Sequence, residues 1–197
     1  MISRYTKYLT SAALGAVILS GCFQSDYTKL VKAELDKGVR KDSLLFGIRF
    51  GDTRNDFYGK CFDLNKQRLV TQGPANTSVQ YLFTDSAIHK APTEIRLLFF
   101  PEYDEQGVIA EMNMEFSYPG WAPWNRALQS DTLLARTKDL LMHWYQGNEF
   151  VTADVNDSPM PVKLDANRRV LVYIKDAQNV AVKIQDILHP KFKHSVN

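Results

Sequence analysis

The clearest pattern in the chain is VIAEMNMEFSY, residues 108–118, in which apolar and polar side chains alternate. Successive side chains of a β-strand point to opposite faces of its sheet, so the alternation predicts a strand. One face would carry Val108, Ala110, Met112, Met114, Phe116 and Tyr118, and the other Glu111, Asn113, Glu115 and Ser117. One apolar and one solvated face are typical of an antiparallel sheet that is covered on one side.

Segments on both sides of this strand have the patterns of further strands and of helices. We expect strands over residues 78–84, 94–100, 150–154, 160–164, 169–175 and 179–187, and helices over residues 24–43, 52–68 and 130–146. The order helix, strands, helix, strands predicts an α+β fold with helices packed on one face of an antiparallel β-sheet. The same order is compatible with two halves, each a helix followed by strands.

The chain divides into four predicted segments. Residues 1–21 would be a signal peptide and residues 22–43 a tether or helix, followed by a single α+β domain over residues 44–188 and a flexible polar tail over residues 189–197. A mature chain of roughly 175 residues is long enough to bury a core without disulfides.

The first segment begins with the basic residues Arg4 and Lys7, and its apolar run extends from Leu9 to Leu19. This run is about half the ~20 residues that a membrane-spanning helix needs. A basic start, a short apolar core and small residues at the end are typical of a signal peptide.

The end of this segment, Leu19-Ser20-Gly21-Cys22, resembles a bacterial lipobox, although an ordinary secretory signal with a nearby cysteine is the alternative. The resemblance implies cleavage before Cys22, a diacylglyceryl thioether on its sulfur and an acylated (palmitate-type) amino group. Several acyl chains would anchor the protein stably in a membrane. Phe23, which follows the cysteine, would permit sorting to the outer membrane in systems where aspartate at that position retains lipoproteins in the inner membrane.

Charge and cysteine content narrow the function classes. Loss of Arg4 and Lys7 would lower the formal net charge from +2 to about zero, so we expect no nucleic-acid partner. With Cys22 lipidated, Cys61 would be a lone thiol, more typical of a buried small apolar residue than of a nucleophile.

Two family resemblances bear on the fold. Gly51-Asp52-Thr53 followed by Phe57 is similar to the opening helix of small envelope lipoproteins with the β-lactamase-inhibitor-protein-like fold, although the usual small-Gly-x-Pro ending is absent. Three further strings look like segments of uncharacterised proteins of Bacteroidota: residues 57–66, 118–125 and 165–169. That family carries no assigned activity, so the resemblance implies no catalytic residue.

The polar residues offer few catalytic arrangements. Glu111 and Glu115 could bring two carboxylates together for acid–base chemistry, but a solvated strand face would give the same pattern. His143, on the helix expected over residues 130–146, is more typical of a boundary residue than of a ligand. The four histidines have no metal-ligand spacing; they are His89, His143, His189 and His194. We therefore expect no metal or other cofactor.

The loop after the strand expected over residues 108–118 is the strongest candidate for a binding surface. Trp121 and Trp124 lie between prolines in the segment Pro119–Asn125, next to Tyr118. Exposed tryptophans stack on sugars, anchor protein interfaces or lie at membrane surfaces. The alternative is that they fold back and cover the core.

These observations lead to one expected function and two alternatives. We expect a non-enzymatic lipoprotein of the cell envelope, anchored through Cys22 and binding a protein partner through the sheet face or the Trp121/Trp124 corner. The first alternative is a glycan- or small-ligand-binding lipoprotein that uses the same tryptophans. The second is a hydrolase with Glu111, Glu115 or His143 in a cleft.

Overall fold

The computed structural model describes residues 26–86, 88–90, 93–155 and 158–195. The expected signal peptide, the lipobox and Cys22 lie outside these residues. Among the described helices, none combines the length and the apolar run that crossing a membrane requires.

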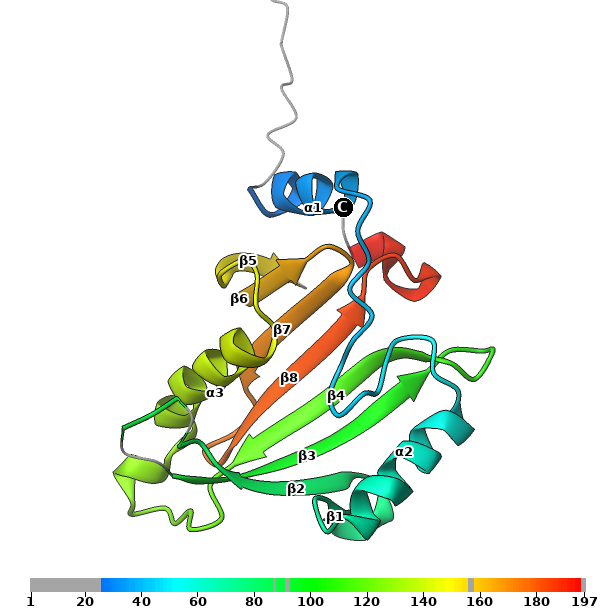
Figure 1. Cartoon of the computed structure of the whole chain (residues 1–197). Coiled ribbons are helices and arrows are strands. Elements are labelled where there is room, and N and C mark those ends of the chain that lie inside the picture. The colour runs from blue at the N-terminus through cyan, green and yellow to red at the C-terminus, as the bar shows by residue number, and fades with distance from the viewer. Residues whose placement is uncertain (1–25, 87, 91–92, 156–157, 196–197) are drawn as a thin grey trace, which may run out of the picture.

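Eight strands form one antiparallel sheet in the order β1-β2-β3-β4-β8-β7-β6-β5 (Figure 1). The strands are β1 Thr71–Gln72, β2 Val79–Thr84, β3 Glu94–Tyr103, β4 Ile109–Ser117, β5 Val151–Val155, β6 Ser158–Asp165, β7 Arg168–Ile174 and β8 Asn179–Asp186. The expected mixture of helices with an antiparallel sheet is therefore confirmed. Two consecutive meanders, β1–β4 and β5–β8, join through the pairing of β4 with β8.

Three α-helices accompany the sheet: α1 Asp26–Asp36, α2 Arg54–Lys66 and α3 Ser130–Trp144. Three short 3-10 helices cover Pro74–Asn76, Arg126–Leu128 and Pro190–Ser195, here called η1, η2 and η3. The first helix is shorter than expected, because Gly38 adopts a positive φ of 64° and its N–H bonds to the Leu35 carbonyl, which ends the helix.

The apolar face of β4 forms the centre of the main core. Met114 pairs with Phe99 of β3 and with Val182 of β8, and opposed residues of antiparallel strands lie on the same face. The same core cluster contains Phe57 of α2 and Leu133 of α3. These two helices therefore cover the apolar face, where each fully buried large side chain stabilises the fold by about 1.5–3 kcal/mol.

The polar face of β4 is not solvated, which corrects the expectation for that face. Glu111 is only 2 % exposed, and Asn113 and Ser117 are buried as well. Because β4 lies in the middle of the sheet, long side chains from β3, β7 and β8 surround these residues. Glu111 accepts a hydrogen bond from Gln185, whose side-chain oxygen in turn accepts one from Arg169 Nε at 2.9 Å.

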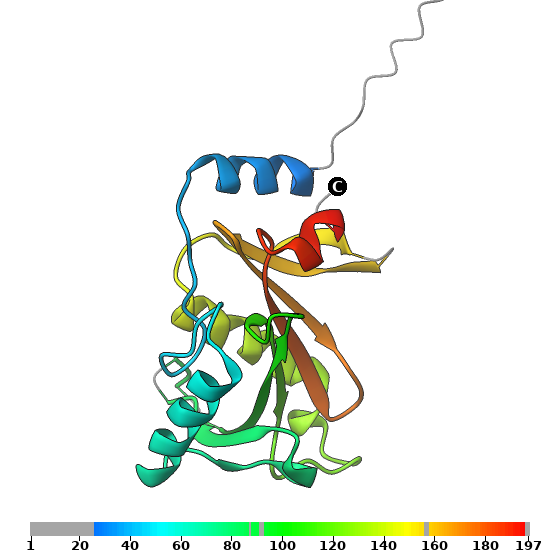
Figure 2. The same cartoon turned by 90° about the vertical axis from the view of Figure 1, so that its right-hand side faces the viewer.

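Helix α1 packs on this second face. Tyr27 packs against the cluster of Val162 and Leu171, and its hydroxyl accepts a hydrogen bond from Arg169 at 3.3 Å. Arg169 pairs with Gln185 of β8, which pairs with Glu111, so all three lie on the polar face of β4. The expectation that the helices share one sheet face is thus not confirmed, and α1 lies at the opposite end of the molecule from α2 (Figure 2).

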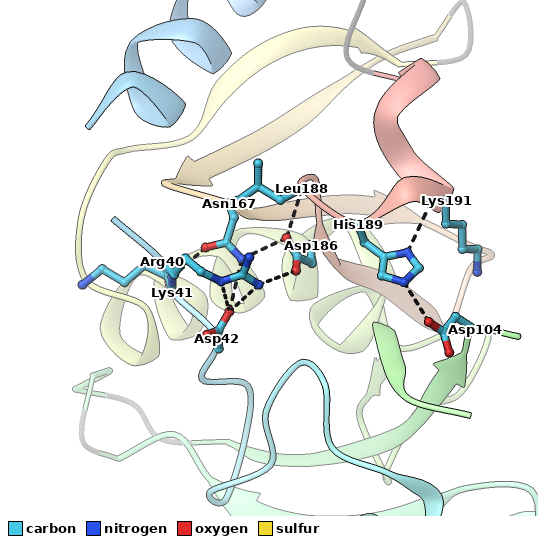
Figure 3. Close-up of polar contacts among 9 residues, drawn as sticks. All are labelled: Arg40, Lys41, Asp42, Asp104, Asn167, Asp186, Leu188, His189 and Lys191. Carbon is cyan, nitrogen blue, oxygen red and sulfur yellow. Dashed lines mark hydrogen bonds and ion pairs between the residues drawn. The ribbon is translucent and has the colours of Figure 1, made fainter. Parts of the chain in front are cut away.

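The segment expected to be a tether is bound to the turn between β6 and β7. The Glu34 carboxylate accepts hydrogen bonds from the Ala166 N–H at 3.0 Å and from the Asn148 amide at 2.6 Å. Lys41 N donates to Asn167 Oδ1 at 2.6 Å, and Arg40 pairs with Asp186 at 2.9 Å (Figure 3).

The C-terminal segment, expected to be a flexible tail from residue 189 onward, has regular structure as far as Ser195. His189 Nε2 lies 2.9 Å from Asp104 Oδ2, while His189 Nδ1 accepts a hydrogen bond from Lys191 N (Figure 3). The proton therefore belongs on Nε2, which donates to Asp104. Phe192 is 6 % exposed, so η3 is packed against the domain.

Candidate binding surfaces

The structure separates the three aromatic residues that the sequence grouped into one surface. Tyr118 is 1 % exposed, so it belongs to the core and not to a binding surface, which corrects that prediction. Trp121 is partly buried, and its indole N–H lies 3.2 Å from both Gln129 Oε1 and the Ala177 carbonyl. Trp124 is 84 % exposed and is the one member of the group that faces solvent.

The loop that carries Trp124 is held by hydrogen bonds from one glutamine. Gln129 Nε2 donates to the Ala122 carbonyl at 2.9 Å and to the Asn125 carbonyl at 2.8 Å, while its Oε1 accepts from Trp121. Because both ends of this amide are used, the loop presents Trp124 on a fixed backbone. A single exposed tryptophan can stack on one ring or fill one pocket of a partner.

A second surface is a groove of about 630 Å³ between α2, β1, η1 and the outer end of β3. One wall carries two exposed aromatic side chains of α2: Tyr58 is 56 % and Phe62 is 61 % exposed. Its lining consists of Arg54, Phe57, Tyr58, Cys61, Phe62, Asn65, Val70, Thr71, Gln72, Asn76, Thr77, Ser78, Val79, Phe99, Phe100, Pro101 and Tyr103.

Helix α2, which forms one wall, is fixed at its first turn. The Thr53 hydroxyl accepts a hydrogen bond from the Asp56 N–H, and the Asp56 carboxylate accepts one from Thr53 N at 2.9 Å. This reciprocal capping box satisfies amide groups that have no partner inside the helix. The hydrogen bonds from Thr53 also lower the pKa of Asp56. Phe57 anchors the same turn in the core at 4 % exposure.

Tyr58 and Phe62 are four residues apart, so they lie next to each other on the surface of α2. They flank Phe57 and Cys61, which face the core, and so extend the apolar stripe of the helix beyond the part that is covered. This spacing is visible in the sequence and could have indicated the wall.

The ionisable groups of the groove are not prepared for covalent chemistry. Burial raises the pKa of the Cys61 thiol to about 11, so it is protonated at neutral pH and is a poor nucleophile. Burial likewise raises the pKa of Tyr103 to about 12. Arg54 lies over the Tyr103 ring at 4.4 Å, and it is the one charged residue in the lining.

The three residues considered for hydrolysis do not converge. Glu111 is buried in the hydrogen-bond network of the second sheet face, and Glu115 pairs with Lys175. His143 lines a separate cavity of about 420 Å³ together with Tyr81, Phe83 and Trp144. This cavity lies on the apolar face of the sheet, opposite the face that carries Glu111 and Glu115. In the part of the chain that the structure describes, no cluster of side chains could hold a metal ion.

Comparison with protein-family models, with curated proteins and with solved structures found no match to this chain.

Proposed function

We propose that this protein is a lipid-anchored lipoprotein of the cell envelope that acts as a non-enzymatic protein-binding module. The observation that carries the proposal is the position of the exposed aromatic side chains. The groove at α2 and β1 lies at the end of the molecule opposite α1 (Figure 1). Apolar side chains exposed together on a folded domain mark an interaction site more often than single ones do.

The anchor would hold this end of the molecule away from the membrane. Cys22 precedes the first residue of α1, Asp26, by four residues, a span of roughly 14 Å at full extension. A lipid on Cys22 therefore keeps α1 near the bilayer, with the aromatic groove directed toward other envelope proteins. Phe23 would permit sorting to the outer membrane in systems where aspartate at that position retains lipoproteins in the inner membrane.

In-cell crosslinking of the native lipoprotein, followed by mass spectrometry, tests this function. We expect one envelope protein to be captured reproducibly by the wild type. Capture should fall strongly for Tyr58→Ser/Phe62→Ser, while Ile174→Ser, which alters an exposed apolar residue of β7, serves as the matched control. If a folded, anchored wild type captures no specific protein, the proposal is overturned.

One observation favours a second candidate, a glycan-binding lipoprotein. Trp124 is 84 % exposed on a rigid loop, as a stacking platform for a sugar ring would be. Titration with envelope glycans should then quench tryptophan fluorescence saturably, and Trp124→Ala should abolish the effect. A flat titration of the wild type would exclude this candidate.

The repeated order of elements supports a further proposal, that the domain consists of two helix-plus-strands halves. Helix α2 precedes the meander β1–β4, and α3 precedes the meander β5–β8. The last strands of the two meanders pair antiparallel, as expected for two similar units related by an approximate two-fold axis.

A further inference from the structure

We propose that the groove binds an extended, acidic segment of a partner polypeptide, which adds a strand to the outer end of β3 and places a carboxylate against Arg54. The inference rests on the proposed protein-binding function and specifies its site and the chemistry of its partner. Three features of the groove support it: a free strand edge, apolar walls and one cationic side chain.

The free edge results from the unequal lengths of neighbouring strands. β3 extends from Glu94 to Tyr103, but its pairing with β2 ends where Phe99 meets Val79. From Phe100 onward β3 pairs only with β4 among the described strands. Beyond Val79 the chain turns toward η1, where Gly73 N bonds to the Ser78 carbonyl. Backbone groups on such an edge can pair with an added strand.

The edge is suited to a short strand. Pro101 has no N–H, and the register shifts between Glu102 and Tyr103. Prolines and bulges on edge strands prevent long sheet-to-sheet pairing, so the edge disfavours a continuous sheet formed with a second copy of the chain. A short peptide can use the remaining backbone groups and take most of its affinity from side-chain pockets.

The walls provide these pockets. Phe62 and Tyr58 on α2 are both exposed, while Phe57 and Phe99 close the groove toward the core. Alternate side chains of an extended segment point to the same side, so every second residue of the occupant would enter the groove. Aromatic or large aliphatic residues at those positions would bury the exposed rings of Tyr58 and Phe62.

Charge specifies the rest of the occupant. Arg54 is the one charged residue in the lining, and within the described residues no carboxylate lies at ion-pair distance from it. The Tyr103 ring lies beneath the guanidinium, and its hydroxyl is buried with no hydrogen-bond partner among the described residues. A planar guanidinium pairs well with a carboxylate through two parallel hydrogen bonds. An Asp, a Glu or a free C-terminal carboxylate of the partner fits this end of the groove.

The position of the groove excludes the supporting membrane as its occupant. Helix α1, to which the proposed anchor is attached, lies at one end of the molecule, and α2 with β1 lies at the other (Figure 2). An acyl chain or lipid headgroup of the same bilayer would have to reach past the whole sheet.

Peptide selection on the intact, detergent-solubilised lipoprotein tests the inference. The probe is a phage library of random seven-residue peptides, followed by fluorescence anisotropy with one enriched peptide. We expect enriched sequences to alternate apolar with other residues and to carry one Asp or Glu. Binding should slow amide hydrogen exchange at the non-proline residues of Phe100–Tyr103.

A double-mutant comparison isolates the ion pair. Arg54→Gln should weaken binding of the acidic peptide by about tenfold or more, as for a charge-assisted hydrogen bond. For the same peptide with Asn or Gln in place of its acid, Arg54→Gln should change the affinity less than twofold. Tyr58→Ser/Phe62→Ser should weaken both peptides more than tenfold, and Ile174→Ser should weaken neither.

Several outcomes would overturn the inference. One is enrichment of peptides that bind equally well to wild type and Arg54→Gln; another is the absence of any enriched peptide. Concentration-dependent dimerisation that Phe62→Ser abolishes would assign the groove to a second copy of the chain, and stoichiometric binding of a fatty acid would assign it to a lipid. If the crosslinked partner is captured normally by Arg54→Gln and by Tyr58→Ser/Phe62→Ser, the function stands and the groove is not its site. If no partner is captured at all, the proposed function itself fails.

Discussion

Lys163 carries a charge that is fully removed from water. Its side chain is 0 % exposed, its ammonium group lies 2.9 Å from Asp165 Oδ2, and it donates a hydrogen bond to the Asn148 carbonyl. Asp165 also accepts from Asn148 N at 2.8 Å. The pair thus connects β6 with the loop that follows α3. A buried ion pair is strongly destabilised when one partner is removed, because the other charge stays buried without compensation.

We therefore predict that Lys163→Met lowers the free energy of unfolding by about 3–5 kcal/mol. The matched control is Lys175→Met, which breaks the pair with Glu115 at a lysine that is 51 % exposed and should lower it by less than about 1 kcal/mol. Urea denaturation followed by tryptophan fluorescence measures both. Equal effects of the two substitutions would show that burial of the Lys163 pair has no energetic importance.

Gly147 supports the same interaction through its backbone. Its φ is 143°, and a Cβ atom at this position would lie 2.1 Å from Asp165 Oδ1. We predict that Gly147→Ala destabilises the fold by about 2 kcal/mol or more through strain and displacement of the carboxylate. Gly59, inside α2 with open space around it, is the control: Gly59→Ala should stabilise the fold by about 0.5–1 kcal/mol. Thermal unfolding of both variants shows whether each substitution raises or lowers the stability.

At the scale of elements, α1 depends on a carboxylate. Burial alone would raise the pKa of Glu34, but hydrogen bonds from Lys37, Ala166 and Asn148 outweigh it, and the pKa is lowered. A lowered folded-state pKa means that the stabilisation is complete above the ordinary value of 4.5 and is lost as pH falls through the folded-state pKa. Docking of α1 should therefore weaken in acid.

The prediction can be checked with Glu34→Gln. Protection of the α1 amides against hydrogen exchange, corrected for intrinsic rates, should be lower in the variant than in the wild type at pH 7. The difference should shrink as pH falls below 4.5, because protonation removes the same charge from the wild type. A difference that does not change with pH would mean that shape and not charge holds α1.

The elements themselves were largely predictable from local patterns. The alternation over residues 108–118 identified β4, and the stripe from Leu133 to Leu141 identified α3. The two-residue strand β1 was missed because so short a segment has no period, and its pairing with β2 is its only signature. The polar side of β4 was misassigned because alternation shows that side chains differ between faces. It does not show whether neighbouring strands cover the polar ones.

The candidate site was less predictable than the fold. Trp121 and Trp124 have similar sequence surroundings, yet one donates hydrogen bonds to Gln129 and Ala177 while the other is exposed. The shape of the groove depends on where β2 begins, on the course of η1 and on the position of α2. These are long-range relations that no local pattern contains.

For the whole molecule, the decisive expectation concerns the anchor. We predict that wild-type chain expressed in a bacterial host incorporates labelled palmitate and sediments with membranes. Cys22→Ser should abolish both, because it removes the thiol that accepts the lipid, while Cys61→Ser leaves them unchanged. Palmitate incorporation that survives Cys22→Ser would exclude the lipobox assignment.

The attachment of α1 to the turn between β6 and β7 also has a mechanical consequence. If a partner held at β3 moves relative to a membrane-bound N-terminus, tension can follow the covalent chain from α1 through α2 and β2 to β3. The contacts of Glu34 and Lys41 with the β6–β7 turn, and of Arg40 with the end of β8, give it a second path. That path runs through the ladders β7–β8, β8–β4 and β4–β3, in which β4 and β8 pair from Glu111 to Ser117. The sheet therefore bears part of a load that would otherwise stretch residues 37–53.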